Sequence, residues 1–150
     1  MAQPKPIGAD HPNALAQFSV AVDGLDLGLF TGCDGLSAEY TMEDVNEGGN
    51  NSYVYRLPGR VKYASLKLSR LLTKDSAKVA TWFSKFAQGG VKRGQATITL
   101  YDVHLKPVCT WVLNEVHPVK WTGPNFTTDG TGVAKETLEL TYHGFDWKPK

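Results

Sequence analysis

The side chains that could carry out chemistry in this sequence are few and scattered. It holds two cysteines and four histidines, none of which pairs with another at metal-ligand spacing, and no HExxH, CxxC or Walker sequence occurs. Cys109 could form a thiolate–imidazole pair with His104 or His117. However, Cys109 alternates with Trp111 in an apolar strand pattern, where an inert buried thiol is commoner. We therefore predict free thiols, no catalytic site, no metal and no cofactor, with an enzyme that uses Cys109 as an alternative.

The acidic residues offer little more to a catalytic interpretation. Glu43 and Asp44 fall in a polar segment, whereas Glu136 and Glu139 follow one predicted strand. Glu136 lies on the same side as Leu138 and is a candidate for burial, while Glu139 is expected to be solvated. The segment Gly32-Cys33-Asp34-Gly35 lacks the lysine and the following helix of a phosphate loop, so it predicts a turn.

Charge is distributed unevenly along the chain. Residues 34–47 carry acids without any Lys or Arg, whereas residues 56–78 are basic apart from Asp75. The two segments could be solvated surfaces, or complementary patches that suit a head-to-tail interface. The net charge of +1 argues against a dedicated nucleic-acid binder, whose basic excess is usually large.

The elements that must position these residues are mostly strands. Apolar residues alternate with polar ones through most of the chain, and Asp23-Gly24 is a strong hairpin signal. A change of phase between Tyr63 and Leu66 predicts a bulge, or burial on both faces, and Pro58-Gly59 predicts a turn. The predicted strands cover residues 16–22, 25–31, 36–42, 53–57, 60–70, 96–101, 108–113, 116–122 and 137–142.

One segment has helical periodicity instead. Val79, Trp82, Phe83 and Phe86 recur at helical spacing and form a single apolar stripe. This pattern predicts a helix over about 74–88, capped by Thr73 or Asp75 and ended by Gly89-Gly90.

These elements indicate a mainly β (α+β) domain. A β-barrel or two packed antiparallel sheets, with the one α-helix on a flank, would bury the apolar stripes. We expect a flexible N-terminal tail over residues 1–15, then a single domain over 16–147 with an extended loop at 43–57. The tail has no apolar stretch for a signal peptide, so we expect synthesis and assembly in the cytoplasm, and no run is long enough for membrane insertion.

Residues 57–63 read Leu-Pro-Gly-Arg-Val-Lys-Tyr, and residues 118–124 read Pro-Val-Lys-Trp-Thr-Gly-Pro. Together with the closing strand at 136–144 and the opening segments at 18–20 and 30–36, and in the same order along the chain, these segments resemble the phage tail tube protein family. This family comprises the T4-like tail tubes and the inner tube proteins of contractile injection systems. One position departs, because Leu71 stands where the family usually has a glycine.

The resemblance implies a structural subunit rather than an enzyme. In the family, subunits form hexameric rings whose strands join around a lumen, and the rings stack into a tube. A sheath surrounds that tube, and baseplate and cap proteins lie at its ends. Cargo passes through the lumen. The resemblance fits a virion and a bacterial particle alike. The secreted ring protein of type VI secretion is a relative, so a ring protein of a type VI-like system is an alternative assignment. It implies homo-oligomerisation without specific nucleic-acid binding.

The candidate site residues follow from this resemblance and from the charge layout. The polar loop is expected to contact the next ring, against a basic surface of Arg56, Arg60 and Lys62. A polar stripe on the last predicted strand, Thr137, Glu139 and Thr141, is the candidate lumen face. A small-molecule-binding β-barrel, with Trp111 and Trp121 in its pocket, is the rival interpretation. The expected stacking residues are Glu43, Asp44, Val45, Asn46, Glu47, Asn50, Asn51, Ser52 and Tyr53.

Overall fold

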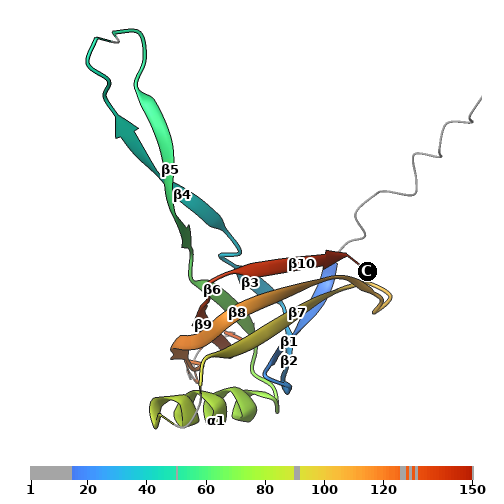
Figure 1. Ribbon diagram of the computed structural model, residues 1–150. Helices are drawn as coiled ribbons and strands as arrows, with labels where there is room; N and C mark the ends of the chain where they lie inside the picture. The colour runs from blue at the N-terminus through green and yellow to red at the C-terminus, as the bar shows by residue number, and fades with distance from the viewer. Residues whose placement is uncertain are drawn as a thin grey trace, which may run out of the picture.

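The computed structural model describes residues 15–49, 51–89, 92–125, 128, 130 and 132–149. These residues form ten strands and one helix (Figure 1). The mainly β class with a single helix is therefore confirmed, and the described strands form no closed barrel. The elements are β1 (Leu15–Val22), β2 (Leu25–Phe30), β3 (Gly32–Asp34), β4 (Ala38–Val45), β5 (Tyr55–Tyr63), β6 (Leu66–Leu71), α1 (Ser76–Ala87), β7 (Gly94–Asp102), β8 (Pro107–Thr122), β9 (Lys135–Thr141) and β10 (Phe145–Pro149).

Eight strands make one antiparallel sheet in the order β2-β1-β7-β8-β9-β6-β3, with β10 also paired to β8. The sheet turns a corner along β8, which pairs with β10 over its first half and with β9 over its second. Glu115 marks the corner with a φ of 52°, a left-handed conformation typical of a bulge. One long strand thus joins both parts of the curled sheet.

The inner face of the curled sheet carries the core. Because side chains alternate across a strand, one face of β1, β6, β7 and β9 turns inward, as the alternation predicted. Leu68 and Leu138, which face each other across β6 and β9, are fully buried. The core also contains Phe18, Val20, Val22, Leu27, Phe30, Leu66, Ala96, Ile98, Leu113, Val116, Leu140 and Tyr142.

A buried ion pair joins two neighbouring strands of this sheet, and its arginine also reaches β2 at one end. Arg70 on β6 pairs with Glu136 on β9, and both side chains are almost completely buried. Arg70 Nη1 also donates to the carbonyl oxygen of Leu27 on β2, at 2.6 Å. Ser76 at the start of α1 donates to the same Glu136 carboxylate at 2.9 Å. The expected burial of Glu136 is correct, and its charge is satisfied by partners from several elements.

The helix α1 packs against β2 and β8 through part of its predicted stripe (Figure 1). Val79 and Trp82 are buried, whereas Phe83 and Phe86 are only half-buried. Asp75 occupies the N-cap position, but its side chain makes no capping hydrogen bond, and instead Ser76 Oγ accepts from the amide of Thr73. Gln88 is the C-cap, Gly89 follows with a φ of 75°, and Gly90 lies outside the described residues.

Other boundaries differ from the sequence-based prediction. The chain between Arg60 and Arg70 is two strands, because β5 ends at Tyr63 and β6 begins at Leu66. The short strands β3 and β10 were not predicted as separate elements. The expected tail at 1–15 lies outside the described residues apart from Leu15, which begins β1.

Candidate assembly surface

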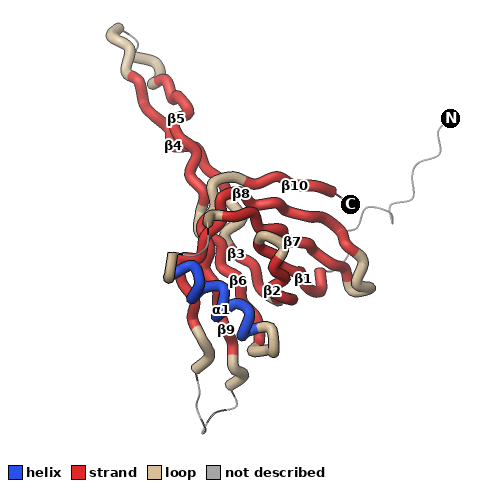
Figure 2. The backbone as a smooth tube through the Cα atoms, turned by 60° about the horizontal axis from the view of Figure 1, so that its bottom comes forward, coloured by secondary structure: helices blue, strands red, loops and turns tan. Residues whose placement is uncertain are grey.

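The strands β4 and β5 form a two-stranded hairpin that projects away from the main sheet (Figures 1 and 2). Within the described residues they pair only with each other, so most of their side chains are exposed. The loop expected at 43–57 is therefore corrected. Glu43, Asp44 and Val45 lie on β4, Tyr55 to Leu57 lie on β5, and the connecting segment spans 46–54.

Pro58 and Gly59 lie within β5 rather than in a turn. The register skips a residue here, so that Gly59 and Arg60 face Thr41 as a bulge. A Cβ on Gly59 would lie 2.7 Å from Thr41 Oγ1 and 2.9 Å from its carbonyl oxygen, so the close strand approach requires glycine. The predicted turn is wrong because the edge position of β5 tolerates a proline in a strand.

Large apolar side chains lie exposed along this hairpin. Tyr40 is 63% exposed, Met42 59% and Leu57 51%, and neighbouring Val61 is also exposed. Tyr40 and Met42 share one face of the hairpin and Leu57 lies on the other, and the described part of the chain covers neither face. Contiguous exposed apolar surface on a folded protein usually marks an interaction site. Sequence reasoning missed this feature, although apolar residues on both sides of a polar loop were a usable signal.

The tip of the hairpin carries an aromatic pair. Tyr53 and Tyr55 meet edge to face, with their hydroxyl oxygens 2.9 Å apart. This hydrogen bond raises the pKa of Tyr55. The predicted stacking residues Asn46, Glu47, Asn51 and Ser52 are exposed at the same tip, and Asn50 lies outside the described residues.

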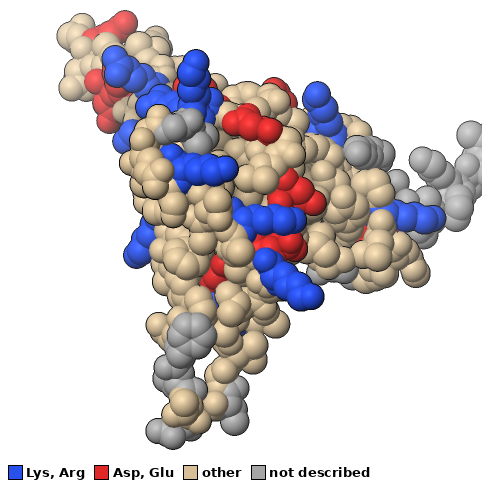
Figure 3. Space-filling view, turned by 90° about the horizontal axis from the view of Figure 1, so that it is seen from below, with Lys and Arg blue, Asp and Glu red and all other residues tan. Residues whose placement is uncertain are grey.

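The basic residues predicted as the partner surface lie on the same hairpin as the acids. Arg56 Nε is 3.4 Å from Asp44 Oδ1, and Lys62 stands directly across from Glu39. Figure 3 shows basic and acidic side chains beside each other on this projection. Asp44 and Arg56 therefore form an ion pair within one chain. Neither side chain needs a partner of opposite charge on another subunit.

The candidate lumen residues Thr137, Glu139 and Thr141 lie on β9, on the face turned away from the core. All are half-buried, and Glu139 stands between Lys67 of β6 and Lys120 of β8 in the strand register. Thr137 faces Ser69 across β6. The predicted stripe is thus part of a wider polar band on the outer side of the sheet.

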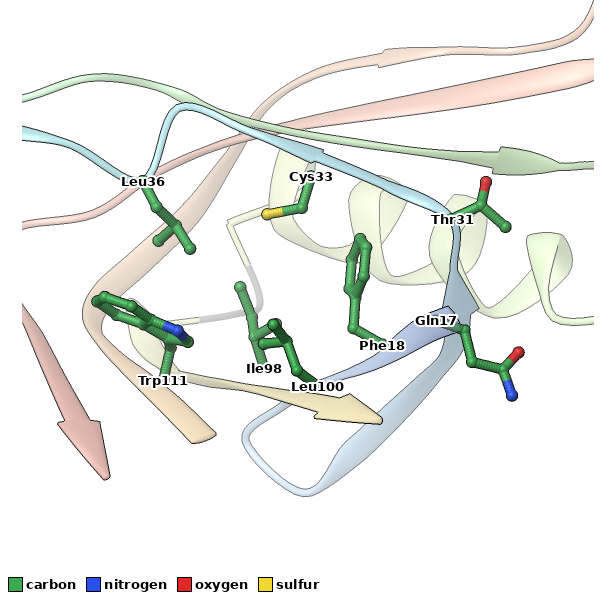
Figure 4. Close-up of a pocket in the computed structure, with 8 residues that line it drawn as sticks. All are labelled: Gln17, Phe18, Thr31, Cys33, Leu36, Ile98, Leu100 and Trp111. Atoms are coloured by element: carbon green, nitrogen blue, oxygen red, sulfur yellow. The ribbon is translucent and has the colours of Figure 1, made fainter. Parts of the chain in front are cut away.

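An apolar pocket of about 290 Å³ opens between β1, β3, β7 and β8 (Figure 4). Phe18, Leu36, Ile98 and Trp111 point into it, and the Cys33 thiol lies at its edge. Cys33 is an exposed residue whose sulfur is partly enclosed by the pocket, and this enclosure, with the charge of Asp34 second, raises the pKa of the thiol to about 11. Trp121, expected beside Trp111, donates instead to Glu136 and does not line this pocket.

The side chains considered for catalysis do not come together. Cys109 is half-buried opposite Leu100, His104 lies in an exposed turn, and His117 stacks on Phe86. No hydrogen bond joins Cys109 to a histidine within the described residues, and no His, Cys, Asp and Glu group there could hold a metal ion. The one helix in that part of the chain is too short and too polar to span a membrane.

Comparison with known families decides what kind of protein carries this exposed hairpin. Residues 15–146 match the family described as T4-like virus tail tube protein gp19. The chain belongs to this family. The resemblance read from the sequence is thereby confirmed. No match was found among curated proteins.

Solved structures with the same fold come from tail-like particles. The chain is 18% identical, with a TM-score of 0.80 and 95% of each chain covered, to a protein from the sheath–tube complex of the extracellular contractile injection system PVC. A protein from the anti-feeding prophage baseplate is 23% identical, with a TM-score of 0.74, 99% of this chain and 98% of that chain covered. Hcp1 from Flavobacterium johnsoniae is more distant, at 13% identity and a TM-score of 0.52, with 89% and 96% covered. At these low sequence identities, the similarity shows that this member of the tail tube family has the same fold as those proteins.

Proposed function

We propose that this chain is the repeating, non-catalytic subunit of the inner tube of a contractile injection particle, stacked as hexameric rings around a lumen. Its tail tube family and its fold support the tube assignment. The projecting hairpin is the observation that carries the proposal furthest, because its apolar side chains are not covered by any other described residue of the same copy.

The hairpin serves as the contact between successive rings. Burying Tyr40, Met42 and Leu57 against a neighbour would stabilise the contact by roughly 25 cal/mol for each Å² of apolar surface removed from water. A ring repeats the contact around its circumference, so a modest contribution from each copy sums to a stable stack. Arg60 and Lys62 remain candidates for contact with another subunit, since neither makes an ion pair within the described residues.

The polar band on β9 lines the bore in this proposal. Thr137, Glu139 and Thr141 present hydroxyl and carboxylate groups, which stay hydrated and leave cargo free to slide. The similar chains occur in sheath–tube, baseplate and cap structures. By analogy, a sheath protein, baseplate and cap proteins, and luminal cargo are the partners of this chain, which assembles in the cytoplasm into a virion or a contractile particle.

A shortened hairpin tests the stacking contact. Glu39 and Lys62 are directly paired, so replacing residues 40–61 by Asn-Gly joins them through a two-residue turn and removes the exposed apolar side chains. The variant should fold and form rings, yet sediment without long tubes. Lys85→Ala, an exposed change on α1, is the control and should polymerise normally. Tubes of normal length from the shortened variant would refute the stacking assignment.

The apolar pocket supports a second candidate function, the binding of a small apolar molecule. Its volume of about 290 Å³ and its aromatic lining would accommodate one ring system. Titration with an apolar fluorophore should then show saturable binding that Ile98→Trp abolishes. Binding unaffected by Ile98→Trp would eliminate this candidate.

A further inference from the structure

The turn that joins β7 to β8 displays apolar side chains in a strained, rigid conformation. Leu105 has a φ of 59°, which costs a bulky residue energy that a glycine would not incur. Its side chain is nevertheless 62% exposed, and that of Val103 is 58% exposed. Neither side chain is needed to fill the core, so folding alone does not explain an exposed leucine in this conformation.

A buried carboxylate fixes the shape of this turn. Asp102 is 4% exposed, and its Oδ1 accepts from the amides of His104 at 2.8 Å and Lys106 at 2.9 Å. The backbone closes the same loop, since Asp102 donates to the carbonyl of Lys106 and accepts from Leu105, each at 3.0 Å. These hydrogen bonds, that from Lys106 first, hold the pKa of Asp102 below its ordinary value. Val103 and Leu105 are thus presented without the entropy cost of ordering a loose loop.

The position of the turn points to a partner outside the single chain. The turn borders the first residue of β1, because Leu15 pairs with Asp102, and the end of β10, because Pro149 pairs with Cys109. Figures 1 and 2 both place it across the body from the β4–β5 hairpin. A head-to-tail assembly requires two different complementary patches on one molecule, and these two features occupy suitable places.

Charge complements the apolar contact. Lys106 in the turn and Lys148 at the end of β10 are exposed and make no ion pair within the described residues. On the outer half of the hairpin, Glu43 and Glu47 likewise have no basic partner there, whereas Asp44 is already paired with Arg56. The outer half of the hairpin therefore offers apolar side chains with unpaired acids, whereas Arg60 and Lys62, which also make no ion pair within the described residues, lie nearer the body. The turn offers apolar side chains with unpaired bases.

We propose that the β7–β8 turn, with Val103 and Leu105 at its centre and Lys106 and Lys148 at its rim, is the surface that receives the β4–β5 hairpin of a second copy. This assignment rests on the proposed tube function and names the two surfaces that meet. In this assignment the acids of the hairpin contact Lys106 and Lys148 of the second copy, and not Arg56 as the sequence suggested. The Asp44–Arg56 ion pair stays within one hairpin.

Removing the Leu105 side chain separates assembly from folding. In Leu105→Gly the positive φ becomes unstrained, so the midpoint of thermal unfolding should not fall. The concentration needed for tube formation should nevertheless rise about tenfold or more, since tenfold corresponds to ~1.4 kcal/mol. Val133→Gly, which removes an exposed side chain elsewhere, should leave that concentration unchanged.

Exchanging the charges of the two surfaces tests whether the β4–β5 hairpin of a second copy binds the β7–β8 turn. Lys106→Glu with Lys148→Glu should impair tube formation, and so should Glu43→Lys with Glu47→Lys. Combining all four changes in one chain, or mixing the two double variants, should restore assembly if these surfaces meet. Absence of restoration overturns the proposal, and so does a Leu105→Gly protein that forms normal tubes but loses sheath binding. If the unaltered chain forms no rings or tubes at all, the tube function itself fails instead.

Discussion

At the scale of single residues, the buried Arg70–Glu136 pair is the most demanding feature of the fold. Its two charges are removed from water, and their cost is offset by a shared carboxylate oxygen, the Leu27 carbonyl and the ring of Phe30, which lies 4.3 Å from the guanidinium carbon. Because these partners come from separate elements, the pair links β6 and β9 to β2 and to the start of α1.

Breaking that pair should be costly. Glu136→Gln leaves the Arg70 charge buried without its counter-charge and should lower the free energy of unfolding by about 3–5 kcal/mol. Glu139→Gln, two residues along on the outer face, should change it by less than about 0.5 kcal/mol. Urea denaturation of both variants provides the comparison, and equal losses would show that the buried pair has no special role.

His117 should make stability depend on pH. Burial, aided by the nearby charges of Arg93 and His143, lowers its pKa below the ordinary value of 6.5. Above about pH 6.5 the ring is neutral in both states, so its full contribution is present there. As the pH falls, the unfolded chain takes up the proton first, and stability is lost as the pH passes through the lowered pKa.

The measurement is the thermal midpoint between pH 7.5 and 5. His117→Gln should flatten this dependence, whereas His104→Gln, in an exposed turn, should not. An identical slope in the two variants would contradict the assignment of this pH dependence to His117.

At the scale of elements, the helix shows what periodicity can and cannot predict. The stripe at Val79, Trp82, Phe83 and Phe86 located α1 correctly, but the sheet beneath buries only its first part. Phe86 instead lies against His117, near the corner of β8. Periodicity identifies the face that a helix turns inward, whereas the extent of the surface that covers it is a tertiary property.

The helix prediction is accordingly centred on Trp82. Trp82→Ala should cost about 3–5 kcal/mol, since it removes a large buried ring. Phe83→Ala should cost less, because that ring is only half-buried. Chemical denaturation would contradict the assignment if the order of the two losses were reversed.

The hairpin explains why part of the candidate site could not be predicted from sequence. Glycine and asparagine at 46–51 correctly indicated a polar tip, and the alternation at Tyr40 and Met42 indicated a strand. Ordinary strand patterns imply a covered face, however, and local sequence does not specify that these strands leave the body. β5 was not predicted as one continuous strand, because Pro58-Gly59 has the composition of a turn although it forms a bulge within the strand.

The acidic and basic segments show a similar limit. The sequence shows both, and they were interpreted either as solvated surfaces or as complementary patches that meet between subunits. The antiparallel register brings Asp44 opposite Arg56 and Glu39 opposite Lys62, which is a property of strand pairing and not of charge order. The position of Thr137, Glu139 and Thr141, the candidate lumen residues, was easier to predict, since a period of two is enough to place them outside the core.

At the scale of the whole molecule, one part of the chain forms the core and another part exposes apolar side chains. The curled sheet and α1 bury one core, while the hairpin and the β7–β8 turn expose apolar side chains at separate places on the body. A monomer gains nothing from that exposure, which raises its risk of aggregation. In a head-to-tail assembly the same surfaces are covered in every copy but those at the ends.

Electron microscopy of the purified chain tests the central claim most directly. Class averages should show hollow rings with sixfold symmetry, and raising the protein concentration should convert them to stacked tubes. Light scattering on the same samples should report a mass several times the 16.4 kDa of one chain. A monodisperse monomer at every concentration, with neither rings nor tubes in the images, would contradict the account.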